Sequence, residues 1–316
     1  MTVSDSPSAT PSPTGRRPMV DQPYVLATLT MLFWAGNTLL GRAIVDVVPP
    51  VALAQMRWTG AFALLVPFAW SHLRRDAALV RGHIVGLSIL AFFGITIYNT
   101  FLYIGVHTTS AVNAAMLSSL FPMTVATLGF IIYRDRLTPM QGFGIALSCV
   151  GAAIILSHGS LAFVMSFRFV AGDLWVLASM VAYSLYTVLL KGRPPVHPLT
   201  LVTVTIFLGQ LFLWPFTIAE GLSGERVHFD APTVASVVYV VIFPAILAYL
   251  CFNRAVELIG SNRIAPFFHL IPVFTSIGAV LLIGEVVAPY HLAGWTLIVV
   301  GIVATQVFRA KAPRKA

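Results

Sequence analysis

The chain has 316 residues, of which 58% are hydrophobic and 9% are charged, and its mean hydropathy is +0.89. Because soluble domains usually carry about 25% charged residues, this composition excludes an ordinary soluble protein and indicates a chain embedded in lipid. In a soluble protein the net charge of +8 would suggest nucleic-acid binding. Here it indicates basic residues gathered at one membrane face.

The first 22 residues are rich in Ser, Thr and Pro and predict a disordered tail. Ten apolar stretches follow, each near the roughly 20 residues that a helix needs to cross the hydrocarbon. The expected spans are Tyr24–Val45, Pro50–His72, Ile84–Val106, Ser110–Tyr133, Met140–Ser157, Gly172–Leu190, Pro198–Ala219, Pro232–Asn253, Gly260–Gly284 and Tyr290–Phe308. The connections are short, so the sequence predicts an all-α integral membrane protein with no soluble domain.

The distribution of Lys and Arg predicts the orientation. With the N-terminus in the cytoplasm, fifteen of the 19 basic residues fall in cytoplasmic stretches and three fall outside. Arg57 is the basic residue inside a predicted span. This positive-inside bias supports ten spans, and it places both termini in the cytoplasm.

The second half of the chain echoes the first half at a fixed distance of about 150 residues. An echo at a fixed period indicates a duplication. Five spans per copy is an odd number, so the second copy is expected to enter the membrane upside down. The matched pairs are Leu120 and Leu270, Pro122 and Pro272, Asp135 and Glu285, Pro139 and Pro289, Gly144 and Gly294, and Gly151 and Gly301. Trp34 aligns with Tyr183, and Pro50 and Pro67 align with Pro198 and Pro215, at slightly smaller distances.

These observations predict two inverted five-helix repeats around a central cavity, a construction common among secondary transporters. A duplicated scaffold without a transport role is the alternative. The expected organisation is a cytoplasmic tail at 1–22, a first repeat at 23–157, a linker at 158–171, a second repeat at 172–308 and a basic cytoplasmic tail at 309–316.

Several short motifs in both halves carry a family resemblance. They are Trp34-Ala35-Gly36-Asn37, Tyr103, Ser110-Ala111, Ala114-Ala115, Leu120-Phe121-Pro122, Ala248-Tyr249, Asn253-Arg254-Ala255, Ser261, Ile271-Pro272-Val273 and Leu282-Ile283-Gly284-Glu285. Over about residues 24–308 the chain resembles a ten-span, EamA-type member of the drug/metabolite transporter superfamily. It departs from many relatives at Arg134-Asp135, where they carry Gly-Glu. The resemblance implies an exporter of amino acids, metabolites or drugs in the bacterial inner membrane.

Polar and aromatic side chains inside the spans are the candidate substrate contacts, because such groups usually face the protein interior. Spacings of three or four residues put them in pairs on one helix face. The expected contacts are Trp34 and Asn37 on the first span, Asn99 and Tyr103 with His107 on the third, Tyr183 and Tyr186 on the sixth, and Phe267 and His269, around Phe268, on the ninth. A role in packing or in the interfacial aromatic belt is the alternative for each single aromatic residue.

Arg57 and His269 each have two interpretations. The Arg57 guanidinium either reaches the outer interface along its own stem or anchors a substrate carboxylate, which its planar fork matches. His269, near the middle of its span, either bonds a neighbouring helix or contacts the substrate or carries a proton.

Prolines and glycines predict hinges and close helix packing. Pro122 and Pro272 each remove a helical hydrogen bond and are candidate hinges, although plain bends are equally consistent. Small faces on the fifth and tenth spans predict scaffold or dimer contacts.

The chain shows no phosphate-binding loop for ATP, and Cys149 and Cys251 lie in apolar runs that suggest neither a disulfide nor a metal site. No cofactor or metal is therefore expected, and an enzyme would need a clustered catalytic triad that the scattered histidines do not supply. The sequence predicts a secondary exporter of small metabolites, with an uptake permease of the same fold as the alternative. The expected partners are a small-molecule substrate, the lipid bilayer and a second copy of the chain, but no nucleic acid.

Overall fold

The computed structural model describes residues 22–44, 48–106, 108–109, 111–165, 169–222, 230–283 and 286–307. Across these residues the regular structure is helical throughout, and ten segments are long and apolar enough to cross a membrane. The expected all-α class and the ten spans are confirmed. The predicted tails lie outside the described residues apart from Gln22, as does His107.

The first half of the chain contains α1 (Pro23–Ile44), α2 (Pro50–Gly82), α3 (Ile84–Ala91), η2 (Phe92–Ile97), α4 (Tyr98–Val106), α5 (Ala111–Ser118), α6 (Phe121–Tyr133) and α7 (Pro139–Leu156). A short helix, α8 (Leu161–Met165), lies in the predicted linker. The second half contains α9 (Ala171–Leu189), η3 (Leu190–Gly192), α10 (Pro198–Leu222), α11 (Ala231–Val240), η4 (Val241–Leu247), α12 (Ala248–Ile259), α13 (Ser261–Ile264), η5 (Ala265–His269), α14 (Leu270–Ile283) and α15 (Pro289–Val307).

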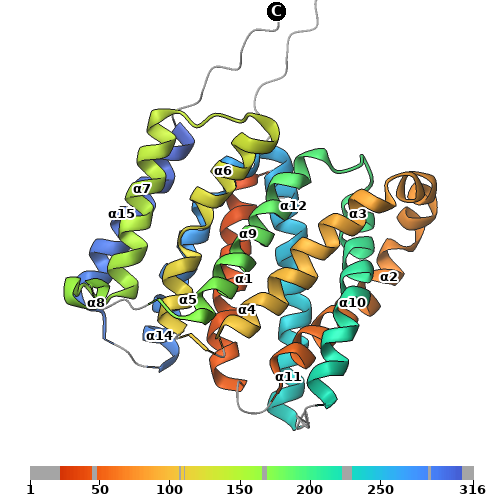
Figure 1. Ribbon diagram of the computed structural model, residues 1–316, viewed down its shortest axis with the longest axis horizontal. Coiled ribbons are helices and arrows are strands. Elements are labelled where there is room, and N and C mark those ends of the chain that lie inside the picture. Colours follow the sequence, from red (N-terminus) through yellow and green to blue (C-terminus); the bar gives the residue numbers. More distant parts are fainter. Residues whose placement is uncertain are drawn as a thin grey trace, which may run out of the picture.

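Counterpart helices of the two halves pack on each other. Figure 1 shows α7 beside α15 at one edge of the bundle and α2 beside α10 toward the other, and both pairs are in extensive contact. In the middle, α1 packs on α12 and α14, while its counterpart α9 packs on α4 and α6. This exchange of partners is the contact pattern that a twofold relation between two copies produces.

Glycines bring α7 and α15 into backbone contact. A Cβ atom placed on Gly144 would lie 2.5 Å from the Gly301 carbonyl oxygen, and one on Gly151 would lie 2.8 Å from the Gly294 carbonyl oxygen. In the repeat, Gly144 corresponds to Gly294 and Gly151 corresponds to Gly301. The contact of Gly144 with Gly301 is therefore equivalent to the contact of Gly294 with Gly151. The faces of α7 and α15 that carry these glycines therefore pack directly on each other within the chain.

Four spans are interrupted, and the interruptions occur at corresponding places. η2 in the third span and η4 in the eighth are π-helical, and the second of them contains Pro244. The fourth span is broken at Ser119–Leu120 before Pro122, and the ninth passes through the 3₁₀ turn η5 before Pro272. Pro122 and Pro272 thus lie in the first turns of α6 and α14, where a missing N–H is tolerated. Their role as hinges stays a prediction.

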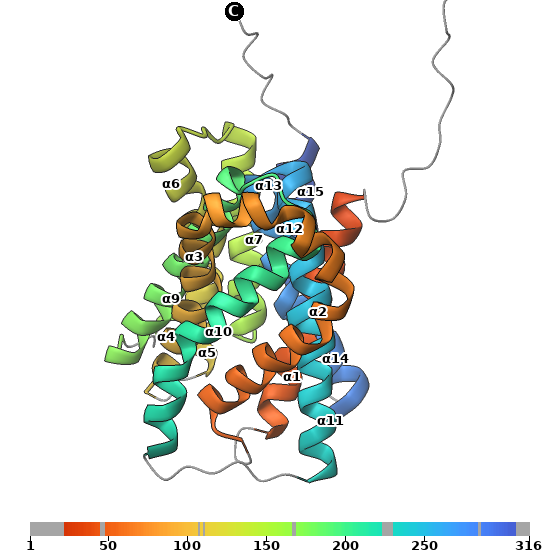
Figure 2. The ribbon, with the colours of Figure 1, turned by 90° about the vertical axis from the view of Figure 1, so that its right-hand side faces the viewer.

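Figure 2 shows α2 and α10 crossing side by side, and polar contacts join the two helices at both ends of the pair. At one end the Glu220 carboxylate accepts the N–H groups of Val51 and Ala52 at the start of α2, at 2.9 and 2.7 Å. At the other end Asp76 accepts the His197 N–H at 2.9 Å. His197 immediately precedes α10, and its Nδ1 atom accepts the Leu199 N–H at 3.2 Å, so its side chain acts as a helix cap.

We expect Gly144→Ala to destabilise the protein and Gly142→Ala to leave it as stable or slightly more so. The first Cβ meets the Gly301 carbonyl, while nothing lies within 4 Å of a Cβ at Gly142. Overpacking of this kind costs about 1–3 kcal/mol, and Ala is otherwise favoured over Gly within a helix. Thermal unfolding of the two variants in detergent measures the difference. Equal losses in both variants would contradict the close contact of α7 with α15.

A second prediction concerns pH. The His197 ring stacks on the His72 ring with centroids 3.6 Å apart. Burial, and then the neighbouring His72, lower the pKa of His197 below its usual value, with a smaller effect in the same direction from Arg75 and an opposing one from Asp76. Because the folded pKa of His197 lies below the unfolded one, this contribution to stability is fully present above the unfolded pKa of about 6.5 and is lost as the pH falls from there through the lower folded pKa.

His197→Asn should keep the cap at α10 and remove this titration. The thermal midpoint of the wild type should therefore fall more between about pH 7.5 and about pH 5.5 than that of the variant. His83→Asn, a change at the exposed residue that follows α2, should behave as the wild type. Parallel pH profiles for all three proteins would refute the role of His197.

Candidate functional site

Aromatic side chains from six spans meet at the centre of the bundle. Trp34 of α1 lies against Tyr183 of α9 with ring centroids 5.7 Å apart, and against Phe268 of η5 at 5.3 Å. Phe121 of α6 closes on Phe268 at 3.8 Å, and Phe252 of α12 on Trp34 at 5.4 Å. Both halves contribute, so neither could build this centre alone. We call the group the aromatic centre: Trp34, Tyr98, Phe121, Tyr183, Tyr186, Tyr249, Phe252 and Phe268.

The two π-helical segments contact the aromatic centre in corresponding ways. The Trp34 indole Nε1–H donates to the Pro244 carbonyl oxygen of η4 at 3.2 Å. The Tyr249 hydroxyl donates to the Gly94 carbonyl oxygen of η2 at 2.8 Å. Gly94 and Pro244 are 150 residues apart, so each copy of the duplicated unit offers one carbonyl to an aromatic side chain at the centre.

Arg57 and Asn99 lie beside the aromatic centre and are joined to each other. The Arg57 Nη2 atom donates to Asn99 Oδ1 at 2.6 Å, and both residues are buried. The guanidinium carbon lies 4.6 Å from the centre of the Trp58 ring, which in turn meets the Tyr249 ring edge-on at 5.1 Å. Arg57 is 8% exposed, so its guanidinium does not reach the outer interface in this conformation.

Tyr186 links the aromatic centre to the end of the bundle. Its hydroxyl donates to Asn253 Oδ1 on α12 at 2.8 Å. Beyond this bond lies an open, polar hollow of about 720 Å³, with Leu190 and Val256 among its lining residues. We call it the basic vestibule because four cations line it: Arg136, Lys191, Arg193 and Arg263.

Ion pairs engage two of the vestibule's cations. Lys191 pairs with Asp135 at 2.7 Å, and Arg193 pairs with Glu257 at 2.8 Å. The first pair joins the connection after α6 to η3, and the second joins the chain after η3 to α12. On the predicted orientation this end of the bundle faces the cytoplasm.

The candidates on the ninth span separate in the structure. His269 is 1% exposed, and its Nε2 atom lies 2.8 Å from the Ser119 carbonyl oxygen and its Nδ1 atom 2.8 Å from the Ser148 hydroxyl. A carbonyl only accepts, so Nε2 carries the proton in this bond. Phe267 stacks on Tyr24 with centroids 6.3 Å apart, and Phe268 is the member of the run that enters the aromatic centre.

Among the other candidates, the structure brings Trp34, Tyr183 and Tyr186 together and places Arg57 and Asn99 beside them. Asn37, one turn from Trp34 on α1, is partly buried. The Tyr103 side chain lies outside the described residues. The sequence analysis did not select Tyr249 or Asn253 as contacts. The repeat distance of 150 residues could have identified them, because Tyr249 corresponds to Asn99 and Asn253 corresponds to Tyr103.

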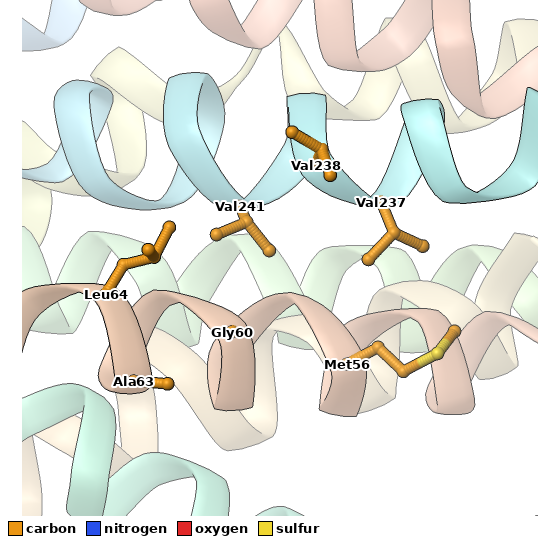
Figure 3. A pocket seen from close by; sticks show the side chains of 7 residues that line it. All are labelled: Met56, Gly60, Ala63, Leu64, Val237, Val238 and Val241. Carbon is orange, nitrogen blue, oxygen red and sulfur yellow. The ribbon is translucent and has the colours of Figure 1, made fainter.

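A second hollow, of about 310 Å³, lies between α2 and the segment formed by α11 and η4 (Figure 3). Its lining is apolar throughout: Met56, Gly60, Ala63, Leu64, Val237, Val238 and Val241. Binding sites for small molecules normally add a few placed polar groups that fix orientation. The aromatic centre with Arg57 and Asn99 has such groups and this hollow has none, so the aromatic centre is the better candidate site.

Comparison with known proteins agrees with this architecture. A solved crystal structure of another protein superimposes with a TM-score of 0.74, covering 90% of this chain and 96% of that one, at 17% identity, which shows the fold alone. An uncharacterized transporter of Archaeoglobus fulgidus is 29% identical over 289 residues, or 91% of this chain and 98% of its own length. The uncharacterized transporter YyaM of Bacillus subtilis is 25% identical over 90% of this chain and 93% of its own length.

A protein of Salmonella typhimurium named as a probable amino-acid metabolite efflux pump is 25% identical over 88% of this chain and 92% of its own length. The model of the EamA-like transporter family matches residues 22–157 and 170–306, once in each half. These two matches cover nearly the whole of the ten-span region. The chain is therefore a multi-pass membrane protein that belongs to the EamA-like transporter family.

Proposed function

We propose that this protein is a secondary transporter that exports small amphipathic metabolites by alternating access. The observation that carries the proposal is the aromatic centre, which the two halves build jointly and which rings fill in this conformation. A site between two related halves can open to one side and then to the other when the halves exchange conformations. The proposed substrate contacts are Trp34, Arg57, Asn99, Tyr183 and Tyr186.

The interruptions of the spans support movement around this centre. π-helical and 3₁₀ segments often mark places where a helix can change its path. η2 and η4 lie at corresponding positions, as do the breaks before Pro122 and Pro272. We propose these four places as hinges, with the bond from Tyr186 to Asn253 separating the centre from the basic vestibule.

The proposed location is the bacterial inner membrane, with both termini and the basic vestibule in the cytoplasm. The positive-inside distribution of Lys and Arg supports this orientation. The relative from Salmonella typhimurium, named as a probable efflux pump, supports export as the direction. An enzymatic role finds no support in these relatives, which are named as transporters.

Purified protein in liposomes should exchange labelled small amphipathic solutes in a saturable way. Trp34→Ala should reduce the exchange rate by roughly tenfold or more, which corresponds to about 1.4 kcal/mol, because it removes a ring that contacts four others in the centre. Trp214→Ala, a change of the same kind on the exposed side of α10, is the control and should retain the rate. No exchange across a broad panel, or equal rates for both variants, would argue against the proposal.

A labelling experiment tests the orientation of the two halves. In a protein whose two native cysteines are replaced by Ala, Arg136→Cys and Val286→Cys introduce exposed thiols at corresponding positions, 150 residues apart. In intact cells a membrane-impermeant maleimide should label the thiol at 286 and reach the thiol at 136 only after lysis. Labelling of both from the same side would contradict the inverted repeat.

A further inference from the structure

The centre of the protein contains a buried cation, Arg57, that has no anionic partner among the described residues. The described contacts of the Arg57 guanidinium are Asn99 Oδ1 and the face of Trp58, both of them neutral, and its Nε–H has no hydrogen-bond partner. A buried charge is costly unless it is paired, and a guanidinium matches a carboxylate through two parallel hydrogen bonds. The missing partner is therefore expected to come from outside the chain.

Two further nitrogen donors around Tyr249 also lack acceptors. The indole Nε1–H of Trp58 and the amide Nδ2 of Asn253 are buried without a hydrogen-bond partner. Trp58 meets the Tyr249 ring edge-on, and Asn253 lies one turn beyond Tyr249 on α12. Buried donors left unpaired each cost free energy that an acceptor would recover. An occupant that offers several lone pairs suits this group better than one that offers hydrogens.

The acidic residues in the described part of the chain are engaged at helix ends, away from this group. Asp76 accepts the His197 N–H, Asp173 the Val170 N–H and the Thr109 hydroxyl, and Glu220 the N–H groups that begin α2. Asp230 caps α11. Asp135 and Glu257 are paired in the basic vestibule. Within the described residues, the aromatic centre thus combines one unpaired cation with no counter-charge for a substrate ammonium.

We infer that the substrate class of the aromatic centre is a monoanionic carboxylate with an apolar or aromatic body, in preference to a zwitterionic amino acid. The inference rests on the proposed transport function and narrows its substrates. The carboxylate binds Arg57 and takes up the free Nε–H, and the body replaces ring-to-ring contacts among Trp34, Tyr183 and Phe268.

The ammonium group of an amino acid is what this site selects against. It would be buried in a medium of low dielectric constant, where like charges repel more strongly than in water, with Arg57 as the neighbouring charge. The ring faces offer it a cation–π contact, which is weaker than the free-energy cost of burying an ion. An acid of the same size carries no such penalty.

Three probes that share a phenylethyl skeleton test the inference: 3-phenylpropionate, phenylalanine and phenethylamine, which are an anion, a zwitterion and a cation at neutral pH. Calorimetric titration of the full-length protein in nanodiscs, near neutral pH, should give 3-phenylpropionate at least about tenfold tighter binding than phenylalanine, with phenethylamine weakest. Arg57→Gln should weaken 3-phenylpropionate by about tenfold or more and leave phenethylamine binding no weaker. Arg57→Lys, which keeps the charge and loses the fork, should fall between.

Arg74→Gln is the matched control, because it makes the same change on the same helix at an exposed guanidinium. It should bind all three probes as the wild type does. Because the comparison of probes needs only the wild type, it stands even if the Arg57 variants do not fold. Phenylalanine bound as tightly as 3-phenylpropionate, or equal binding of 3-phenylpropionate by wild type and Arg57→Gln, would overturn the inference.

Exchange assays in liposomes distinguish a wrong substrate class from a wrong proposal of transport. Exchange of phenylalanine or another uncharged or zwitterionic solute, without binding of 3-phenylpropionate, would overturn the substrate class and leave transport in place. Absence of exchange for every solute of a broad panel would overturn both.

Discussion

The constraint on which this structure depends is the absence of water inside a membrane, which obliges the protein to satisfy its own backbone carbonyls. Wherever a helix departs from the α-helical path, carbonyls lose their regular partners. Two of the carbonyls in the π-helical segments, those of Gly94 and Pro244, are met by Tyr249 and Trp34. The interruptions, which we propose as hinges, and the aromatic residues that fill the centre are therefore parts of one arrangement. This explains why polar-tipped aromatic side chains, rather than Leu or Ile, occupy these positions.

His269 also supplies a hydrogen bond to a backbone carbonyl at a break in a span. It lies 150 residues after Ser119, so its bond to the Ser119 carbonyl joins a position to its own counterpart. A bond between corresponding positions is what the predicted twofold relation between the halves requires close to its axis. Its other nitrogen contacts Ser148 on α7 and so ties both broken spans to the scaffold helix. A ring engaged at both nitrogens fits a structural role at the breaks better than direct contact with a solute.

The sequence predicted the ten spans and the register of the duplication because both depend on long-range averages: apolar length, the side of the membrane that basic residues occupy, and a repeat distance. It did not predict local helix phase. In a regular α-helix, Phe267 and His269 were as plausible as Phe268, but the 3₁₀ turn before Pro272 sets the direction of each side chain, and it aims Phe268 at Trp34. Partners are equally hidden from sequence. Arg57 could have reached the interface, and only the three-dimensional packing shows that Asn99 and Trp58 surround it.

The two sets of cations in this protein differ in what they can recognise. In the basic vestibule Lys191 and Arg193 are partly exposed and already paired, so an arriving anion would compete with Asp135, Glu257 and water. Exposed pairs of this kind contribute little, typically under about 1 kcal/mol each. Arg57 is buried, lacks an acidic partner among the described residues and lies beside the rings. On the proposed function, a solute can therefore be attracted by the vestibule for its charge alone, but selection takes place at the centre, where a carboxylate and an apolar body must be present on the same molecule.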